Sequence, residues 1–215
     1  MRTKKLKKTS LSEIVYQNIK NMIKDGVLTL GQKINKNDLA ASLEVSLTPV
    51  SEALNRLKGE GLLEQKSMQG YYIKKFSKIE LLELFAVRAG LEGTAVCLCI
   101  EKKKITEFKK FQSVFSQFKL PLSKTDLVKY RNLDQDFHEK IIKLSHNSII
   151  DNFNQNFNLI KKTYQIGLIR PPEETLEEHL AIIAAILESD HKKAQALLID
   201  HIMNSRNQIL ISYNN

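Results

Sequence analysis

The stretch from Ser42 to Phe76, "SLEVSLTPVSEALNRLKGEGLLEQKSMQGYYIKKF", constrains the fold more than any other part of the chain. Ser46 or Thr48 can cap a helix with Pro49 in its first turn, where a missing N–H costs nothing. The segment "GEGLLEQ" ends that helix. Residues 62–65 then pair with residues 71–75, which predicts a two-stranded wing closed at Gly70.

The residues before this stretch predict two more helices. Ser10 or Ser12 caps a helix with a 3.6-residue apolar period that ends at Gly26. The segment "GVLTLGQKI" is predicted to be a connector, and Asn35 or Asn37 caps a short helix, "DLAASLE". The order helix, helix, turn, helix, wing is that of a winged helix-turn-helix.

After Phe76 the apolar periodicity is helical almost to the end of the chain. The firmest break is at Pro171 and Pro172, since neither proline fits a helix interior. This half is long enough to bury its own core. We therefore predict a mainly α protein with a winged helix-turn-helix domain at residues 1–76 and an all-helical domain at residues 77–215. The six helices predicted in the second domain span residues 78–100, 103–119, 123–145, 147–167, 173–189 and 191–212.

The net charge of +9 is concentrated in the first third of the chain. Residues 1–78 hold 15 Lys and Arg against 7 Asp and Glu, whereas residues 79–215 hold 18 against 17. This asymmetry indicates a module that faces nucleic acid, joined to a module with another task. The alternative is a basic tail that serves solubility, because five of the 15 positive charges lie in the first eight residues. Without them the first part still carries +3.

The compartment follows from the cysteines and from the absence of long apolar runs. Cys97 and Cys99 lie two residues apart in an apolar helical stretch, too close for an ordinary disulfide and without a second pair for a zinc knot. No apolar run approaches the ~20 residues of a membrane span. No apolar segment follows the basic start, as a secretory signal would require. We expect reduced cysteines in or near the core of a cytoplasmic protein.

The sequence resembles the GntR family of bacterial regulators, in the FadR-like branch with an all-helical FCD effector domain. In the first half the resemblance rests on "GVLTLGQKINKNDLAASLEVSLTPVSEALNRLKGEGLL". In the second half it rests on "VRAGLEGTA", "LDQDFHEKIIKLSHN" and "EEHLAIIAAILESDHKKAQALLIDHI". It covers nearly the whole chain, and it implies a homodimer that binds a double-stranded DNA operator and responds to a small organic acid.

The recognition helix departs from the family pattern at two positions. Family members usually carry a pattern like VSRTPVREAL, and Leu47 and Ser51 stand where its two arginines would be. Because arginine is the usual bidentate reader of guanine, base contacts are predicted to be fewer or different. The residues predicted to contact DNA, on this helix and at the wing tip, are Thr48, Ser51, Asn55, Arg56, Lys66, Ser67, Met68, Gln69 and Gly70.

Two of these predictions have particular consequences. Asn55 is suited to adenine in the major groove, and with the wing tip in the minor groove it favours an A·T-rich operator. Arg56 has an alternative role, because Glu52 and Glu60 each lie four residues away and either can hold it in an ion pair off the DNA.

Four residues in the second half form a candidate metal site. Asp134 and His138 are four residues apart, so one helix face presents a carboxylate beside an imidazole. By spacing alone such a pair is common on solvated helices. The FCD resemblance implies that these two residues, with His179 and His201, are the ligands of a divalent metal. The donors suit Zn²⁺ or Ni²⁺.

Three other polar residues of the second half are assigned separately. Arg88 lies in an apolar helix and needs an anion, either Glu92 one turn on or the carboxylate of an effector, which the resemblance implies. His146 and His191 match no ligand position and are predicted to be caps or surface residues.

The predicted function is regulation, not catalysis. We expect a homodimeric transcription regulator whose operator binding is modulated by a small carboxylate at a divalent metal. One alternative is a metal-dependent enzyme acting on organic acids, although no HExxH motif or obvious general base is present. The other alternative is a DNA-binding or structural protein without an effector, whose histidines belong only to the core. The identity of the effector, the metal and the operator, and the choice between activation and repression, cannot be read from the sequence.

Overall fold

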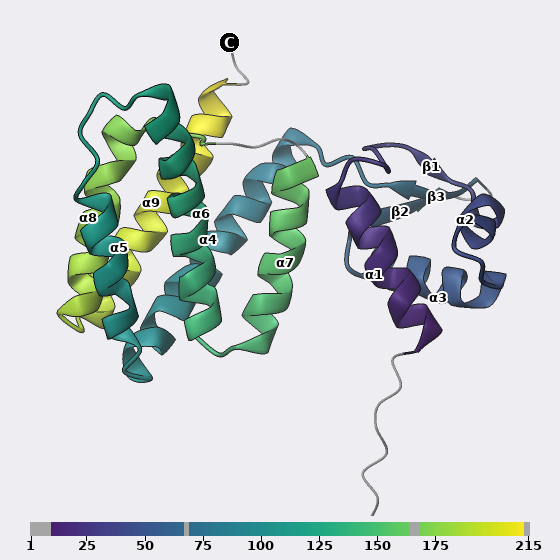
Figure 1. Cartoon of the computed structure of the whole chain (residues 1–215), viewed down its shortest axis with the longest axis horizontal. Helices are drawn as coiled ribbons and strands as arrows, with labels where there is room; N and C mark the ends of the chain where they lie inside the picture. Colours follow the sequence, from purple (N-terminus) through teal and green to yellow (C-terminus); the bar gives the residue numbers. More distant parts are fainter. Residues whose placement is uncertain (1–9, 67–68, 164–167, 213–215) are drawn as a thin grey trace, which may run out of the picture. The chain divides into compact units, whose positions relative to one another are not determined.

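The computed structural model describes residues 10–66, 69–163 and 168–212, which form two compact units (Figure 1). The first consists mainly of residues up to Lys75 and the second mainly of residues from Phe76 onward. Helices dominate, as predicted, and the only sheet among the described residues is a small antiparallel one in the first unit. The elements of the first unit are α1 (Leu11–Lys24), β1 (Lys33–Ile34), α2 (Lys36–Ser42), α3 (Leu47–Gly59), β2 (Leu63–Lys66) and β3 (Gly70–Ile73).

Side-chain caps start α1 and α2 where the sequence predicts, whereas Ser46 precedes α3 without a side-chain cap hydrogen bond. The Ser10 hydroxyl accepts the N–H of Glu13 at 3.2 Å, and the side-chain oxygen of Asn35 accepts the N–H of Asn37 at 3.0 Å. Helix α3 packs on α1 and α2. The resulting core is apolar and includes Val15, Ile19, Val50, Leu54, Leu57 and Ile73. The order and packing of α1, α2 and α3 confirm the predicted helix-turn-helix arrangement.

The sheet has three strands instead of the predicted two, in the order β1-β3-β2. Strand β1 falls in the segment predicted to be a connector and pairs with β3 through Lys33 opposite Tyr72. The Ile73 N–H donates to the Gln32 carbonyl at 2.9 Å, and the Gly31 N–H donates back to the Ile73 carbonyl at 2.9 Å. The connector prediction is therefore wrong at this point, because two residues are too short to show strand periodicity.

Helices α4 to α9 match the six predicted helices, and they belong to the second unit except for the residues of α7 from Asn158 onward, which group with the first unit. The predicted helix at 103–119 begins as a short 3₁₀ turn and ends earlier, and the end of the predicted helix at 147–167 lies outside the described residues. No described helix has the length and apolar character needed to cross a membrane. The elements are α4 (Lys78–Glu101), η1 (Ile105–Glu107), α5 (Phe108–Phe115), α6 (Lys124–Leu144), α7 (Ser148–Thr163), α8 (Pro172–Leu187) and α9 (His191–Ser212).

Helices α4 and α9 approach each other closely at Gly93. A Cβ atom at this position would lie only 2.8 Å from Cγ1 of Ile199 on α9. The glycine therefore permits the close contact between the two helices.

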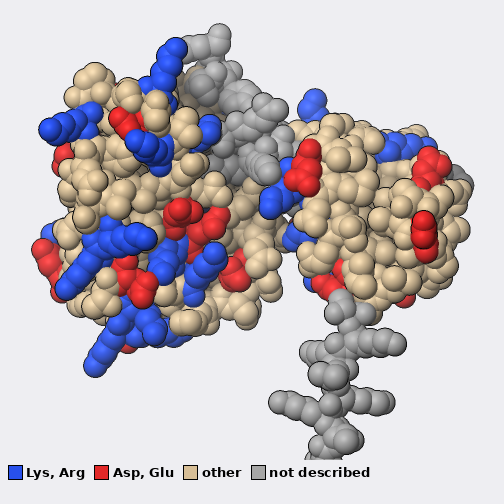
Figure 2. Space-filling view, in the orientation of Figure 1, with Lys and Arg blue, Asp and Glu red and all other residues tan. Residues whose placement is uncertain are grey.

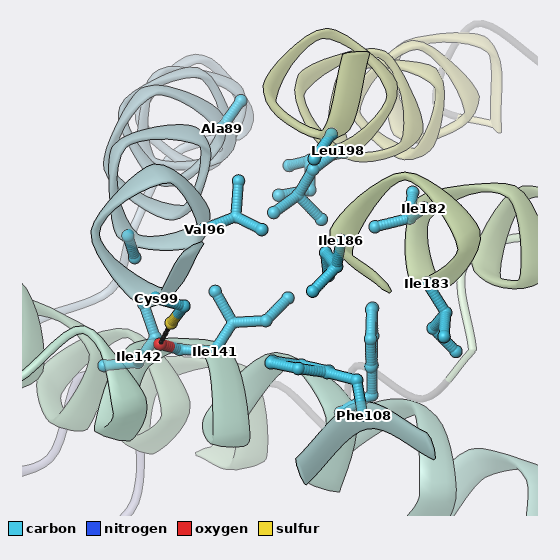
Figure 3. Packing of buried hydrophobic residues seen from close by; sticks show 14 of the residues in the cluster. Ala89, Val96, Cys99, Phe108, Ile141, Ile142, Ile182, Ile183, Ile186 and Leu198 are labelled. Atoms are coloured by element: carbon cyan, nitrogen blue, oxygen red, sulfur yellow. Dashed lines mark hydrogen bonds between the residues drawn. The ribbon is translucent and has the colours of Figure 1, made fainter. Parts of the chain in front are cut away.

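The core of the second unit is apolar and close-packed (Figure 3). Side chains of α4, α5, α6, α8 and α9 meet there, among them Val96, Phe108, Ile141 and Ile186. Cys99 belongs to this core, and its thiol donates to the Ile141 carbonyl at 3.1 Å. Burial raises the pKa of the Cys99 thiol to about 12. Both cysteines are free, as predicted.

Candidate metal centre and DNA-reading surface

The four predicted metal ligands converge inside the second unit. Helix α6 supplies Asp134 and His138, α8 supplies His179 and α9 supplies His201. One donor atom of each lies within 4.8 Å of the others. Their side chains are 14% exposed for Asp134 and 7% or less for the three histidines. The cluster is therefore enclosed by protein and joins three helices.

Each histidine of the cluster is held through Nδ1 by a residue outside the four. His138 Nδ1 lies 2.5 Å from Glu92 Oε2, and His201 Nδ1 lies 2.6 Å from Glu178 Oε2. An ionised carboxylate only accepts hydrogen bonds, so Nδ1 of these two histidines carries the proton. The Nε2 atoms are then unprotonated and carry the lone pair that a metal needs.

A chain of hydroxyl groups is compatible with the same tautomer for His179. The Thr175 hydroxyl donates to the Pro171 carbonyl at 3.3 Å, and the Tyr130 hydroxyl lies 2.7 Å from Thr175 Oγ1. If Tyr130 donates to Thr175, its oxygen accepts from His179 Nδ1 at 3.0 Å. This assignment satisfies all three side chains and leaves His179 Nε2 without a proton.

His179 Nε2 is the feature that fits a cation best. It is buried and has no hydrogen-bond partner among the described residues, although Asp134 Oδ1 lies 3.2 Å away. In the assigned tautomer both atoms present lone pairs at this distance, an unfavourable arrangement unless a positive charge lies between them. Three imidazole nitrogens and one carboxylate oxygen are a donor set for Zn²⁺, Ni²⁺ or a similar divalent ion.

The electrostatics of the cluster favour neutral imidazoles. Burial lowers the pKa of His201 to about 4, and the neighbouring His179 adds to this effect. Burial likewise lowers the pKa of His138. Neutral imidazole is the form that binds metal, so these ligands need not lose a proton at neutral pH.

Arg88 is buried beside the cluster and uses only part of its guanidinium. Its Nε donates to Glu92 Oε1, the first of the two partners considered from the sequence. Its guanidinium also lies over the ring of Phe157, 5.1 Å from the centroid. Burial opposes ionisation of Glu92, but Arg88 and His138 lower its pKa to about 2. The two Nη atoms have no hydrogen-bond partner within the described part of the chain.

The predicted DNA-reading residues of α3 differ in their solvent exposure and in their contacts with other side chains. Thr48 and Asn55 are exposed and Ser51 is half-buried. Arg56 forms ion pairs with Glu60, at 3.2 Å, and with Glu13. Its guanidinium also lies 3.8 Å from the ring centroid of Tyr16, whereas no ion pair joins it to Glu52 in the described structure. These contacts correspond to the alternative role, in which an ion pair holds Arg56.

Asn55 is oriented by the wing. The buried Tyr71 hydroxyl donates to Asn55 Oδ1, so the amide nitrogen remains the donor of this exposed side chain. At the wing tip Lys66 and Gln69 are exposed, and Gly70 takes a φ of +96° that favours glycine. The predicted contacts Ser67 and Met68 lie outside the described residues.

Comparison with known proteins places both units in one family. Residues 11–73 match the model of bacterial regulatory proteins of the gntR family, and residues 83–204 match the FCD domain. The chain belongs to the GntR family of transcription regulators, in the FadR-like branch with an FCD domain. It is a regulator and not an enzyme.

Two relatives and one solved structure cover most of this GntR regulator. The Nta operon transcriptional regulator of Aminobacter aminovorans is 30% identical over 192 residues, which are 84% of this chain and 85% of that protein. The probable D-xylose utilization operon transcriptional repressor of Paenarthrobacter nicotinovorans is 25% identical, over 93% and 89% of the two chains. The structure of E. coli McbR/YncC shares the fold, with a TM-score of 0.64 and 24% identity over 95% of this chain and 99% of that one.

Several residues that contact the candidate metal ligands of this GntR regulator were not predicted from its sequence. Tyr130, Thr175 and Glu178 contact its histidines, and no spacing signal marks them. Glu92 was predicted only as a partner of Arg88, but it also contacts His138. The other two histidines of the chain lie outside the cluster. His146 is exposed, and His191 is the first residue of α9.

Proposed function

We propose that this GntR regulator binds its operator as a homodimer and that a small carboxylate, held at a divalent metal in the second unit, modulates this binding. The observation that carries the proposal is the convergence of ligand atoms from three histidines and one carboxylate within 4.8 Å of one another, with the buried Nε2 of His179 lacking a hydrogen-bond partner among the described residues. Asp134, His138, His179 and His201 would hold the ion, with Zn²⁺ or Ni²⁺ preferred by these donors. The ion would supply an electrophilic attachment point for an oxygen of the effector.

Arg88 is the proposed partner of the effector carboxylate. Its Nε is committed to Glu92, but its terminal nitrogens are not used by other described residues. Two parallel N–H donors match the geometry of a carboxylate. Because the surrounding side chains are almost fully buried, the effector that fits must be small.

In the first unit we propose that α3 and the wing contact the operator. Leu47 is 47% exposed at the start of α3, so an apolar side chain stands where the family usually has arginine. Phosphate contacts from lysines and backbone N–H groups would supply most of the affinity. Binding should therefore be strongly salt dependent and modestly sequence selective, with contacts from Thr48, Ser51, Asn55, Lys66, Gln69 and Gly70. Arg56 would join them only by exchanging its ion pairs with Glu13 and Glu60 for a contact with DNA.

The proposal also covers the division of the chain into domains, its assembly and its compartment. The DNA-binding domain spans residues 1–76, and the effector and dimerisation domain spans residues 77–215. The face of the second unit shown in Figure 2 mixes basic and acidic side chains, which suits a domain that does not itself bind DNA. Two-fold operators call for a dimer. We place the protein in the cytoplasm with the bacterial chromosome and propose repression, the sign that the name of the Paenarthrobacter relative states.

Metal analysis of the full-length protein, purified without chelator, tests the central part of the proposal. We expect one equivalent of divalent metal per chain, or its uptake from a panel of Zn²⁺, Ni²⁺ and Mn²⁺ after chelation. Operator fragments selected from random DNA then report whether small carboxylates change the affinity of the metal-loaded form. Protein that neither contains nor rebinds metal would instead support the alternative without an effector, in which the four residues are a polar core network.

A further inference from the structure

A second buried arginine is joined to the cluster through a glutamate, as Arg88 is joined to it through Glu92. Arg170, whose side chain is 5% exposed, precedes α8. Its Nη2 donates to Glu178 Oε1 at 2.6 Å, and its Nη1 donates to Glu178 Oε2 at 3.0 Å. Its Nε donates to Glu174 Oε2 at 3.2 Å. All three guanidinium nitrogens are therefore engaged by carboxylates of α8.

Glu178 carries this network to the metal-ligand cluster. Its Oε2, which also contacts Arg170, accepts from His201 Nδ1 at 2.6 Å. Its Oε1 accepts from Asn204 Nδ2 at 3.3 Å. The carboxylate is thus fixed by groups from both sides, and it joins the start of α8 to two residues of α9.

The arrangement repeats the order arginine, glutamate, histidine found for Arg88, Glu92 and His138, with one difference. Arg88 uses only Nε, which leaves its terminal nitrogens for another partner in the described structure. Arg170 makes a two-nitrogen contact with its glutamate and has no such reserve. The two arginines are therefore suited to different tasks.

We propose that Glu178 and Arg170 are positioning residues of the metal centre, which fix His201 as the Nδ1–H tautomer with its Nε2 directed at the metal. This inference rests on the proposed metal binding. A carboxylate on Nδ1 sets the orientation of a ligating imidazole and raises its basicity, and losing such a partner typically weakens metal affinity by about 10–100-fold. Arg170 in turn holds the carboxylate in a fixed plane through its paired donors.

The test compares metal affinity in Glu178→Gln, Arg170→Met and the wild type. Affinity for Zn²⁺ is measured in the full-length chain by competition with a chelating dye, and Co²⁺ replaces Zn²⁺ for absorption spectra. We expect Glu178→Gln to bind Zn²⁺ about 10–100-fold more weakly and to shift the Co²⁺ ligand-field bands, because the Nδ1 partner loses its charge. Arg170→Met should change both readouts in the same direction.

Glu174→Gln is the matched control, because Glu174 also contacts Arg170 but makes no contact with His201. It should keep the wild-type affinity and the wild-type Co²⁺ spectrum. Arg170→Lys keeps the charge but not the paired donors, so its loss should be intermediate, and it replaces Arg170→Met if that variant does not fold.

The outcomes separate this inference from the proposed function. Wild-type affinity and spectrum in Glu178→Gln would overturn the positioning role while leaving the metal site intact. A weaker affinity with an unchanged Co²⁺ spectrum would also overturn it, since the loss would then reflect general destabilisation. A wild type that binds neither Zn²⁺ nor Co²⁺ would overturn the metal site itself and this inference with it.

Discussion

Replacing His179 with alanine should abolish the stabilisation that a divalent metal gives to this regulator. His179 is fully buried, and its ring stacks on Phe115 with the centroids 4.7 Å apart. The substitution removes the unpartnered Nε2 that the cation would satisfy, and it also removes core packing. The apo variant is therefore expected to be less stable than the apo wild type, so the informative quantity is the shift in Tm that metal induces.

The size of that shift follows from linkage. A metal that binds only the native state, at a free concentration of about 100 times its Kd, adds about 2.7 kcal/mol. For a chain of this size 1 kcal/mol moves Tm by roughly 2–4 °C, so the wild type should gain roughly 5–11 °C. His179→Ala should gain almost nothing under the same conditions, because one of the four ligands is missing.

Differential scanning calorimetry of chelated and metal-loaded protein measures both shifts. His146→Ala is the matched control, because this histidine is exposed and lies outside the cluster. It should show the wild-type shift. The reasoning is refuted if Zn²⁺, Ni²⁺ and Mn²⁺ all leave the wild-type Tm unchanged, or if His179→Ala gains as much as the wild type.

Three other substitutions test separate parts of the molecule. Arg88→Ala should keep the metal-induced shift in Tm but lose the further shift caused by a bound carboxylate, with each lost charge-assisted hydrogen bond costing roughly 1.5–3 kcal/mol; an unchanged carboxylate response in calorimetry would contradict this. Leu47→Arg with Ser51→Arg should tighten binding to a selected DNA fragment at fixed salt and steepen the salt dependence by about one unit per new phosphate contact; fluorescence anisotropy that shows neither change would mean that these positions do not face DNA. Gly93→Ala should lower the free energy of unfolding by roughly 1–3 kcal/mol, because its Cβ would meet Ile199 at 2.8 Å; an unchanged midpoint in urea would show that α9 moves aside freely.

Much of the fold could be predicted because its signals are local. Ser10 and Asn35, each one of two candidate caps in the sequence, cap α1 and α2, and the six predicted helices of the second half lie close to α4–α9. Caps act over three or four residues and apolar periodicity over one helix, so neither depends on distant parts of the chain. The four metal ligands were also named from the sequence, but that step needed the family resemblance, since only Asp134 and His138 share a helix.

The tertiary structure alone decided which side chains meet. Strand β1 exists because β3 offers it a partner about 40 residues further along the chain. The histidine tautomers depend on Glu92, 46 residues before His138, and on Tyr130, 49 residues before His179. Arg56 is drawn to Glu13 on another helix in addition to Glu60 one turn away. Such contacts leave no periodic trace in the sequence, because a hydrogen bond depends on distance in space and the chain brings its partners together only when the helices pack.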